Sequence, residues 1–247
     1  MRKFVPVMDS RDIKLIRSLD RKKDRDSSGL FVAEGEKLVG EALNSGFKVE
    51  KVYRIGEIGE QMMSRITLLT HPSPALAVIR QRKQPPFEAK PGLYLSLDSV
   101  RDPGNFGTII RIADWFGVGT ILCSPDTVDV YNPKVVQATM GAIFRVNVIY
   151  MPLPEAADKV HGAGGTVYGT FLDGEDIYGT ELNVGTVSPS MIVIGNEASG
   201  ISPEMASKVD SRLFIPPYPA DLRGSESLNA AVATALTVAE FRRRIYG

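Results

Sequence analysis

The chain has 247 residues, its 29 Lys and Arg are balanced by 29 Asp and Glu, and 43% of its residues are hydrophobic. This composition is typical of a globular protein and excludes a disordered, collagen-like or coiled-coil chain. No apolar run approaches the roughly 18–20 residues that span a bilayer. The start, MRKFVPVMDSRD, lacks the apolar region of a secretory signal, so we expect a cytoplasmic protein with no membrane partner. The single cysteine excludes an internal disulfide, and two histidines are too few for a Cys/His zinc site, so we expect no metal.

Charge is unevenly distributed along the chain. Residues 1–90 carry 18 Lys and Arg against 12 Asp and Glu, a net charge of +6, which leaves −6 for residues 91–247. The main basic cluster consists of Arg17, Arg21, Lys22, Lys23 and Arg25, and a second consists of Arg80, Arg82 and Lys83. Such clusters suit a polyanionic partner, although the interleaved Asp20, Asp24 and Asp26 fit a solvated surface helix equally well.

A domain boundary is predicted at the sequence QPPFEAKPG, where three prolines and a glycine interrupt regular structure. We therefore expect a small basic α/β domain over residues 1–84, a linker over 85–92 and a second domain over 93–247. In the first domain, Ile13, Ile16 and Leu19 have helical spacing. The remaining predicted elements there are strands at 30–35 and 49–55 and a helix at 36–46.

Apolar and amphipathic segments alternate through the second domain. Strands are predicted at 93–97, 120–124, 145–150, 166–172, 191–195 and 212–216, and helical segments at 105–116, 132–144, 153–162 and 203–210. This alternation predicts an α/β fold in which helices cover both faces of a parallel sheet, with a ligand site at the strand ends. Trp115 and Cys123 are expected in the core.

The last segment, residues 227–247, predicts a C-terminal helix. Its apolar stripe consists of Leu228, Val232, Ala235, Leu236 and Ala239, which we expect to dock on the core.

Three loops that follow strands hold the remaining candidates for chemistry. The chain has no phosphate loop, dinucleotide fingerprint, nucleophile elbow or HExxH helix. In the loop of residues 97–118, Asn105 is expected to cap a helix that carries Arg111. In the loop of residues 192–202, glycines flank Glu197 and allow close approach of a flat ligand. In the loop of residues 214–236, Ser225 or Ser227 is expected to cap the final helix.

The residues of these loops occur in a distinctive order. They are Asn105, Gly107 and Arg111, then Gly195, Asn196, Glu197 and Gly200, and then Ile215, Pro216, Ser227, Leu228 and Asn229. In this order they resemble the three motifs of the SpoU/TrmH family of RNA ribose 2′-O-methyltransferases, of the SPOUT class. The resemblance covers the chain from residue 93 to the end, and the N-terminal segment is similar to the RNA-substrate-binding domain of many members.

The resemblance implies a site, a cofactor and partners. It implies Arg111 as a catalytic residue with Asn105, Glu197 and Asn229. Because a guanidinium is a poor general base, we expect Arg111 to bind a phosphate and stabilise alkoxide charge. The residues implied to bind S-adenosylmethionine are Thr170, Gly195, Asn196, Ile215, Ser227 and Leu228. The main basic cluster and Arg223 would bind RNA, with ribosomal RNA favoured over transfer RNA.

The family also implies a C-terminal trefoil knot and a homodimer, to which Trp115 or the stripe from Leu228 to Leu236 would contribute. Two alternatives remain open. One is a non-catalytic RNA-binding protein on the same fold, against which the intact Arg111, Glu197 and Asn229 argue. The other is a small-molecule enzyme on a doubly wound fold, which the missing phosphate and dinucleotide loops disfavour.

Overall fold

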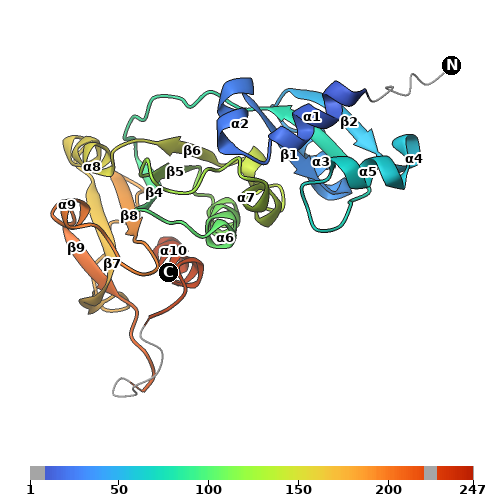
Figure 1. The fold of residues 1–247 in the computed structure, drawn as a ribbon. Coiled ribbons are helices and arrows are strands. Elements are labelled where there is room, and N and C mark those ends of the chain that lie inside the picture. The colour runs from blue at the N-terminus through green and yellow to red at the C-terminus, as the bar shows by residue number, and fades with distance from the viewer. Residues whose placement is uncertain (1–8, 220–226, 247) are drawn as a thin grey trace. The chain divides into compact units, whose positions relative to one another are not determined.

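The computed structural model describes residues 9–219 and 227–246, and the chain divides into two compact units (Figure 1). The first unit holds the described residues up to Lys83 together with Asp129–Arg145. The second holds Gln84–Val128 and the described residues from Val146 onward. The segment Asp129–Arg145 therefore packs with the first unit, although its place in the sequence lies within the predicted second domain.

The first unit is built on a three-stranded antiparallel sheet in the order β1-β3-β2. Its strands are β1 (Leu30–Glu34), β2 (Val49–Arg54) and β3 (Ala75–Arg80), and its first helices are α1 (Ser10–Ser18), α2 (Lys22–Ser28), α3 (Glu36–Leu43), α4 (Ile55–Ile58) and α5 (Glu60–Ile66). Strand β3 was not predicted, yet it is the central strand and five of its six residues are buried. Ile16 and Leu19 pack with Val32 and Leu76 in the core, as the spacing of the apolar residues indicates.

The segment Asp129–Arg145 contributes α7 (Pro133–Ala138) and the 3₁₀ helix η1 (Ala142–Phe144) to this unit. We predicted one amphipathic segment here, but Met140 and Gly141 have φ angles of 51° and 100° and separate the two helices. Its aromatic side chains pack on the unit: the ring centroid of Tyr131 lies 4.6 Å from that of Phe31.

The environment of Arg25 differs from the one predicted for the main basic cluster. Its side chain is 2% exposed and pairs with Asp129, with 2.6 Å between Nη2 and Oδ2. Its Nη1 donates to the carbonyl oxygens of Leu19 and Asp20. The prediction that Arg25 binds RNA is therefore wrong, because the folded chain encloses its guanidinium and satisfies it internally.

The second unit contains the predicted parallel sheet. Its strands are β4 (Gly92–Leu97), β5 (Thr120–Cys123), β6 (Asn147–Tyr150), β7 (Thr166–Asp176), β8 (Pro189–Ile194) and β9 (Ser211–Phe214), in the order β6-β5-β4-β8-β7-β9. Every pair in this sheet is parallel, as the short apolar strands indicated.

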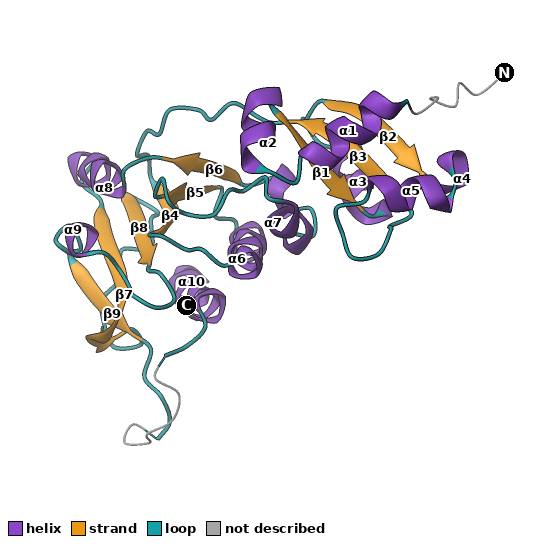
Figure 2. Ribbon diagram, viewed as in Figure 1, coloured by secondary structure: helices purple, strands orange, loops and turns teal. Residues whose placement is uncertain are grey.

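Helices flank this sheet (Figure 2). They are α6 (Pro103–Trp115), α8 (Leu153–Gly162), α9 (Pro203–Ala206) and α10 (Ala230–Tyr246). Leu122, Met191 and Val193 pack with residues of α8 and α9 in one buried cluster. Successive strand residues face opposite sides, so Ile192 and Ile194, which are also buried, point to the other face. Helices α6 and α10 pack against each other.

Two expectations about burial are wrong, and one is confirmed. The stripe predicted to dock on the core, which begins just before α10, is largely exposed: Leu228 and Val232 are each 48% exposed. The opposite side of the helix, which includes Val238 and Phe241, is buried instead. Trp115 is 85% exposed and does not pack in the core, whereas Cys123 is fully buried, and burial raises the pKa of its thiol. None of the described helices has the length and hydropathy needed to cross a membrane.

Candidate active site

A cleft of about 1000 Å³ opens along β7 and at the carboxyl ends of β8 and β9 in the second unit. Thr170 of β7, Gly195 after β8, Leu213 of β9 and Leu228 before α10 line it. All six residues expected to bind the cofactor belong to its lining: Thr170, Gly195, Asn196, Ile215, Ser227 and Leu228. The structure thus brings together segments that lie far apart in the sequence, at the sheet edge where α/β proteins bind ligands.

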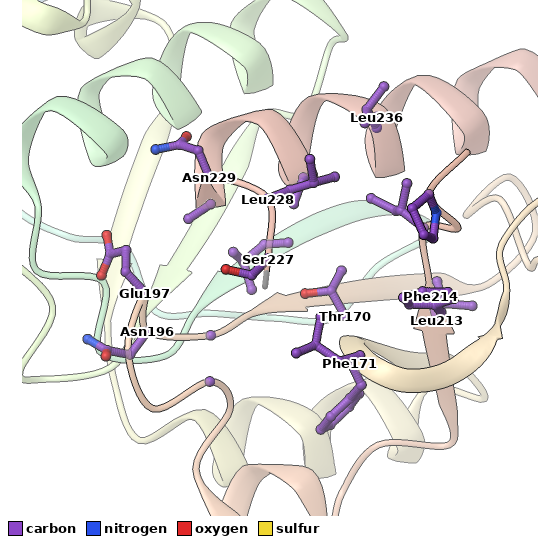
Figure 3. A pocket seen from close by; sticks show the side chains of 18 of the residues that line it. Thr170, Phe171, Asn196, Glu197, Leu213, Phe214, Ser227, Leu228, Asn229 and Leu236 are labelled. Atoms are coloured by element: carbon purple, nitrogen blue, oxygen red, sulfur yellow. The ribbon is translucent and has the colours of Figure 1, made fainter. Parts of the chain in front are cut away.

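The cleft has an apolar end and a polar end (Figure 3). Leu213 and Phe214 lie at one end, and Asn196, Glu197 and Asn229 lie at the other. Among the described residues that line it, Glu197 is the one charged side chain. A ligand with a flat apolar part and a positive charge therefore suits this cleft better than a phosphorylated one.

The polar end is connected by a chain of side-chain hydrogen bonds. Nδ2 of Asn229 donates to Oδ1 of Asn105 over 2.8 Å, and Nδ2 of Asn105 donates to Oε1 of Glu197 over 2.9 Å. One residue comes from each of the three loops selected from the sequence. The three loops therefore meet at a single hydrogen-bonded group.

The capping roles expected for these loops are corrected by the structure. Helix α6 is capped by Asp102, whose Oδ1 accepts from the backbone N of Asn105 over 2.7 Å. The side chain of Asn105 is thereby left to bind Glu197. At the start of α10, Oδ1 of Asn229, and not Ser227, accepts from the backbone N of Ala231. The alternative candidate Ser225 lies outside the described residues.

Gly195 and Gly200 line the cleft, and the geometry of their own loop also requires them. A Cβ atom on Gly195 would overlap the backbone of Gly200 and Ile201, and Gly200 has a φ of 69°. Asn196 and Gly200 exchange two backbone hydrogen bonds of 2.9 Å. The glycines are required because the loop returns closely on itself, which places Glu197 at its tip.

Arg111 lies on α6, is exposed, and has no hydrogen-bond or ion-pair partner among the described residues. It does not line the cleft. Its side chain is therefore available to a partner molecule.

The candidate RNA-binding residues lie on exposed surface of the first unit, apart from Arg25. Arg17 donates to the carbonyl oxygen of Thr67, and Arg21 pairs with Asp24. Lys22 pairs with Asp26 over 2.7 Å, and Lys23 is exposed. Arg223 lies outside the described residues.

Sequence reasoning missed several residues that build the site. Phe171, Tyr178 and Phe214 line the cleft. Asp98, which is 5% exposed, follows β4, and its Oδ2 accepts from the backbone N of Ser202 over 2.7 Å. The signal for Asp98 was a carboxylate at the carboxyl end of a buried strand, where a charge must find a partner.

These features define an α/β enzyme with a ligand cleft at the carboxyl ends of a parallel sheet. The SpoU rRNA Methylase family model matches residues 92–239, and the MRM3-like substrate binding domain model matches residues 10–85. The chain belongs to the SpoU rRNA methylase family, whose members are S-adenosylmethionine-dependent RNA methyltransferases, so the predicted family, enzyme class and cofactor are confirmed.

The similarity to individual relatives extends over most of this chain and most of each relative. The chain is 30% identical to the 23S rRNA (guanosine(2553)-2′-O)-methyltransferase RlmP of Bacillus subtilis over 241 residues, 92% of this chain and 94% of that protein. It is similar to a solved AdoMet-bound rRNA methyltransferase from Sinorhizobium meliloti, with a TM-score of 0.83, 31% identity and coverage of 96% and 95% of the two chains. A TrmH-family structure from Porphyromonas gingivalis gives a TM-score of 0.87 at 37% identity, with coverage of 96% and 99%.

Proposed function

We propose that this chain transfers the methyl group of S-adenosylmethionine to a ribose 2′-hydroxyl of ribosomal RNA. The observation that carries the proposal is the cleft, where residues from three loops meet and Glu197 provides a single negative charge beside apolar walls. The likeness to relatives named as 23S rRNA 2′-O-methyltransferases supports ribosomal RNA as the substrate. Transfer RNA is the alternative.

The residues present in the cleft suit this cofactor. When bound, it supplies a methyl group on a positively charged sulfur. Leu213, Ile215 and Leu228 would hold the adenine between apolar surfaces, and the backbone beside Gly195 would offer hydrogen bonds. Glu197 and Asn196, at the polar end, would face the positively charged part.

The catalytic group that we propose contains Arg111, Asn105, Glu197 and Asn229. Asn105 donates to the Glu197 carboxylate and Asn229 donates to Asn105, so the two amides would orient this carboxylate. A guanidinium is a poor general base, so Arg111 would bind a phosphate of the RNA and stabilise negative charge that develops on the 2′-oxygen. Holding the hydroxyl in line with the methyl group supplies much of the rate.

The division of labour in the chain is also a proposal. Residues 1–84 would bind the RNA substrate, and residues 93–247 would carry out methyl transfer. Residues 85–92 would be the linker between these two domains. The main basic cluster without Arg25, together with Arg223, would contact phosphates. Interactions of this kind make binding strongly dependent on salt, because each one releases counterions from the RNA.

Three further properties of the family belong to the proposal. The C-terminal part of the second unit would form a trefoil knot. Two copies would associate through exposed apolar residues of the second unit, for which Trp115, Val232 and Leu236 are the candidates, being 85%, 48% and 40% exposed. A cytoplasmic location would follow from the likeness to the Bacillus subtilis enzyme.

The decisive experiment is methyl transfer from tritiated S-adenosylmethionine to ribosomal RNA and, separately, to transfer RNA. We expect label in ribosomal RNA, at one nucleotide that resists alkaline hydrolysis because its 2′-oxygen is methylated. The variant Arg111→Ala should bind S-adenosylhomocysteine normally and lose transfer. Absence of label from both RNAs, with cofactor binding intact, would contradict the proposal and favour the non-catalytic alternative.

A further inference from the structure

Ser99, two residues beyond the end of β4, has a backbone conformation that residues with a side chain rarely adopt. Its φ angle is 60°. In this conformation its carbonyl oxygen accepts a hydrogen bond of 2.7 Å from Nδ2 of Asn196. Asn196 directly precedes Glu197, so the strained residue is tied to the loop that carries the charged group of the cleft.

Asn196 in turn organises that loop. Its Oδ1 accepts from the backbone N of Ala198 over 2.9 Å and from that of Ser199 over 3.1 Å. The side chain thus uses its donor on Ser99 and its acceptor on the loop. If the Ser99 carbonyl moved, the Asn196 side chain would have to move with it, and so would the backbone on both sides of Glu197.

The conformation of Ser99 is held by Asp126, which lies after β5. Oδ2 of Asp126 accepts from Oγ of Ser99 over 2.6 Å, and Oδ1 accepts from Oγ of Ser124 over 2.7 Å. The same Oγ of Ser124 accepts from the backbone N of Ser99 over 2.8 Å. One carboxylate therefore restrains Ser99 through its side chain and, by way of Ser124, through its backbone.

Asp126 is ionised at neutral pH. The hydrogen bonds from Ser99 and Ser124 lower the pKa of its carboxyl. Hydrogen bonds to an ionised acceptor are about twice as strong as neutral ones, so this restraint is well suited to oppose backbone strain.

We propose that Asp126 is a positioning residue for methyl transfer. It acts through Ser99 to hold the loop at which Glu197 meets Asn105, while Asp126 itself is not among the described residues that line the cleft. This inference rests on the proposed function. It gives a role to the positive φ of a non-glycine residue that is hydrogen-bonded to Asn196 of the cleft.

The first test compares Asp126→Ala with Asp158→Asn in the full-length protein. Asp158, on α8 of the second unit, is likewise a bonded carboxylate: it forms an ion pair with Lys208 at 2.6 Å. We expect Asp126→Ala to lower kcat about tenfold, because a charge-assisted restraint is lost, and Asp158→Asn to have no effect. A rate for Asp126→Ala equal to that of the wild type would overturn the proposal.

The second test is a double-mutant cycle with Ser99→Gly. Glycine adopts a positive φ without strain, so the backbone of the Ser99→Gly variant no longer needs the carboxylate. We expect Asp126→Ala to reduce kcat at least about threefold less in the Ser99→Gly background than alone. Equal reductions in the two backgrounds would show that Asp126 acts by another route and contradict the inference.

A measurement independent of catalysis separates this inference from the proposed function. Amide hydrogen exchange at Ala198 and Ser199 should accelerate in Asp126→Ala and return toward the wild-type rate in the double variant, even if no RNA is methylated. Unchanged exchange at these amides in Asp126→Ala would also contradict the positioning role. Absence of methyl transfer by the wild type would contradict the proposed function alone.

Discussion

Asn229 donates a hydrogen bond of 2.8 Å to Asn105 across 124 residues of sequence. The direction of this bond is set locally, because Oδ1 of Asn229 is occupied by the first turn of α10, which leaves Nδ2 to reach Asn105. The Oδ1 of Asn105 is then occupied, so its Nδ2 faces Glu197. A helix cap thus orients the amides of the polar end of the cleft.

This arrangement predicts which of two substitutions at Asn105 lowers the rate of methyl transfer more. Asn105→Ala leaves Glu197 and Asn229 without their partner, and we expect kcat to fall about tenfold. Asn105→Asp should be worse, because it places a second carboxylate against Glu197. Methyl transfer at saturating RNA measures both, with Asn147→Ala on the edge strand β6 as the control. Equal activity of the Asp variant and the wild type would refute the network.

Gly195 provides a prediction about close packing. In Gly195→Ala the added Cβ overlaps the backbone of Gly200 and Ile201, so the loop that carries Glu197 must move. We expect calorimetry to show at least about tenfold weaker binding of S-adenosylhomocysteine. In the control Gly162→Ala, the new Cβ meets no atom within 4 Å, and binding should be unchanged. If Gly195→Ala binds like the wild type, the loop has more freedom than its contacts indicate.

The buried ion pair of Arg25 and Asp129 predicts a loss of stability in the first unit. Arg25→Met leaves the Asp129 carboxylate, which is 12% exposed, without its partner. The free energy of unfolding should fall by about 3–5 kcal/mol, as for other broken buried pairs. The exposed pair of Arg21 and Asp24 is the control, and Arg21→Ala should change stability by less than about 1 kcal/mol. Urea unfolding, followed by a probe in the first unit, measures both variants, and similar losses would contradict the structural role.

Glu240 predicts a pH dependence of stability. Hydrogen bonds from Arg243, and then from Arg244, lower the pKa of Glu240 from 4.5 to about 2. A lowered folded-state pKa means that the carboxylate stabilises the fold fully above pH 4.5 and loses this effect as the pH falls toward 2. The difference in stability between wild type and Glu240→Gln should therefore be largest at neutral pH and shrink over this interval.

Urea unfolding at a series of pH values measures that difference, and Glu204→Gln on α9 is the control. The same arginine also bonds a segment that contributes to the cleft. Arg244, held by Glu240, donates to the carbonyl oxygens of Ile177, Tyr178 and Thr180, and Tyr178 lines the cleft. A pH-independent gap between the two proteins would show that the Glu240 charge does not stabilise the helix end.

The sequence alone determined the strands of the second unit and the location of the site. The six strands of the second unit were predicted because each is a short apolar run bounded by turns or amphipathic segments. Several of the residues that line the cleft were predicted because glycines, asparagines and a glutamate follow three of those strands in an order that resembles the motifs of a known family. Both signals are local, so no knowledge of distant contacts was needed.

Only the tertiary structure decided which partner each side chain meets. Hydrophobic spacing placed Leu228 and Leu236 on one side of α10, but it did not distinguish a cleft wall from the core. A basic cluster did not reveal that Arg25 is enclosed, because its partner Asp129 lies 104 residues away. Likewise, Oγ of Ser99 donates to the carboxylate of Asp126, which follows the neighbouring strand β5. The physical reason is the same each time: burial and hydrogen bonding depend on distances in space, which the fold sets between segments remote in sequence.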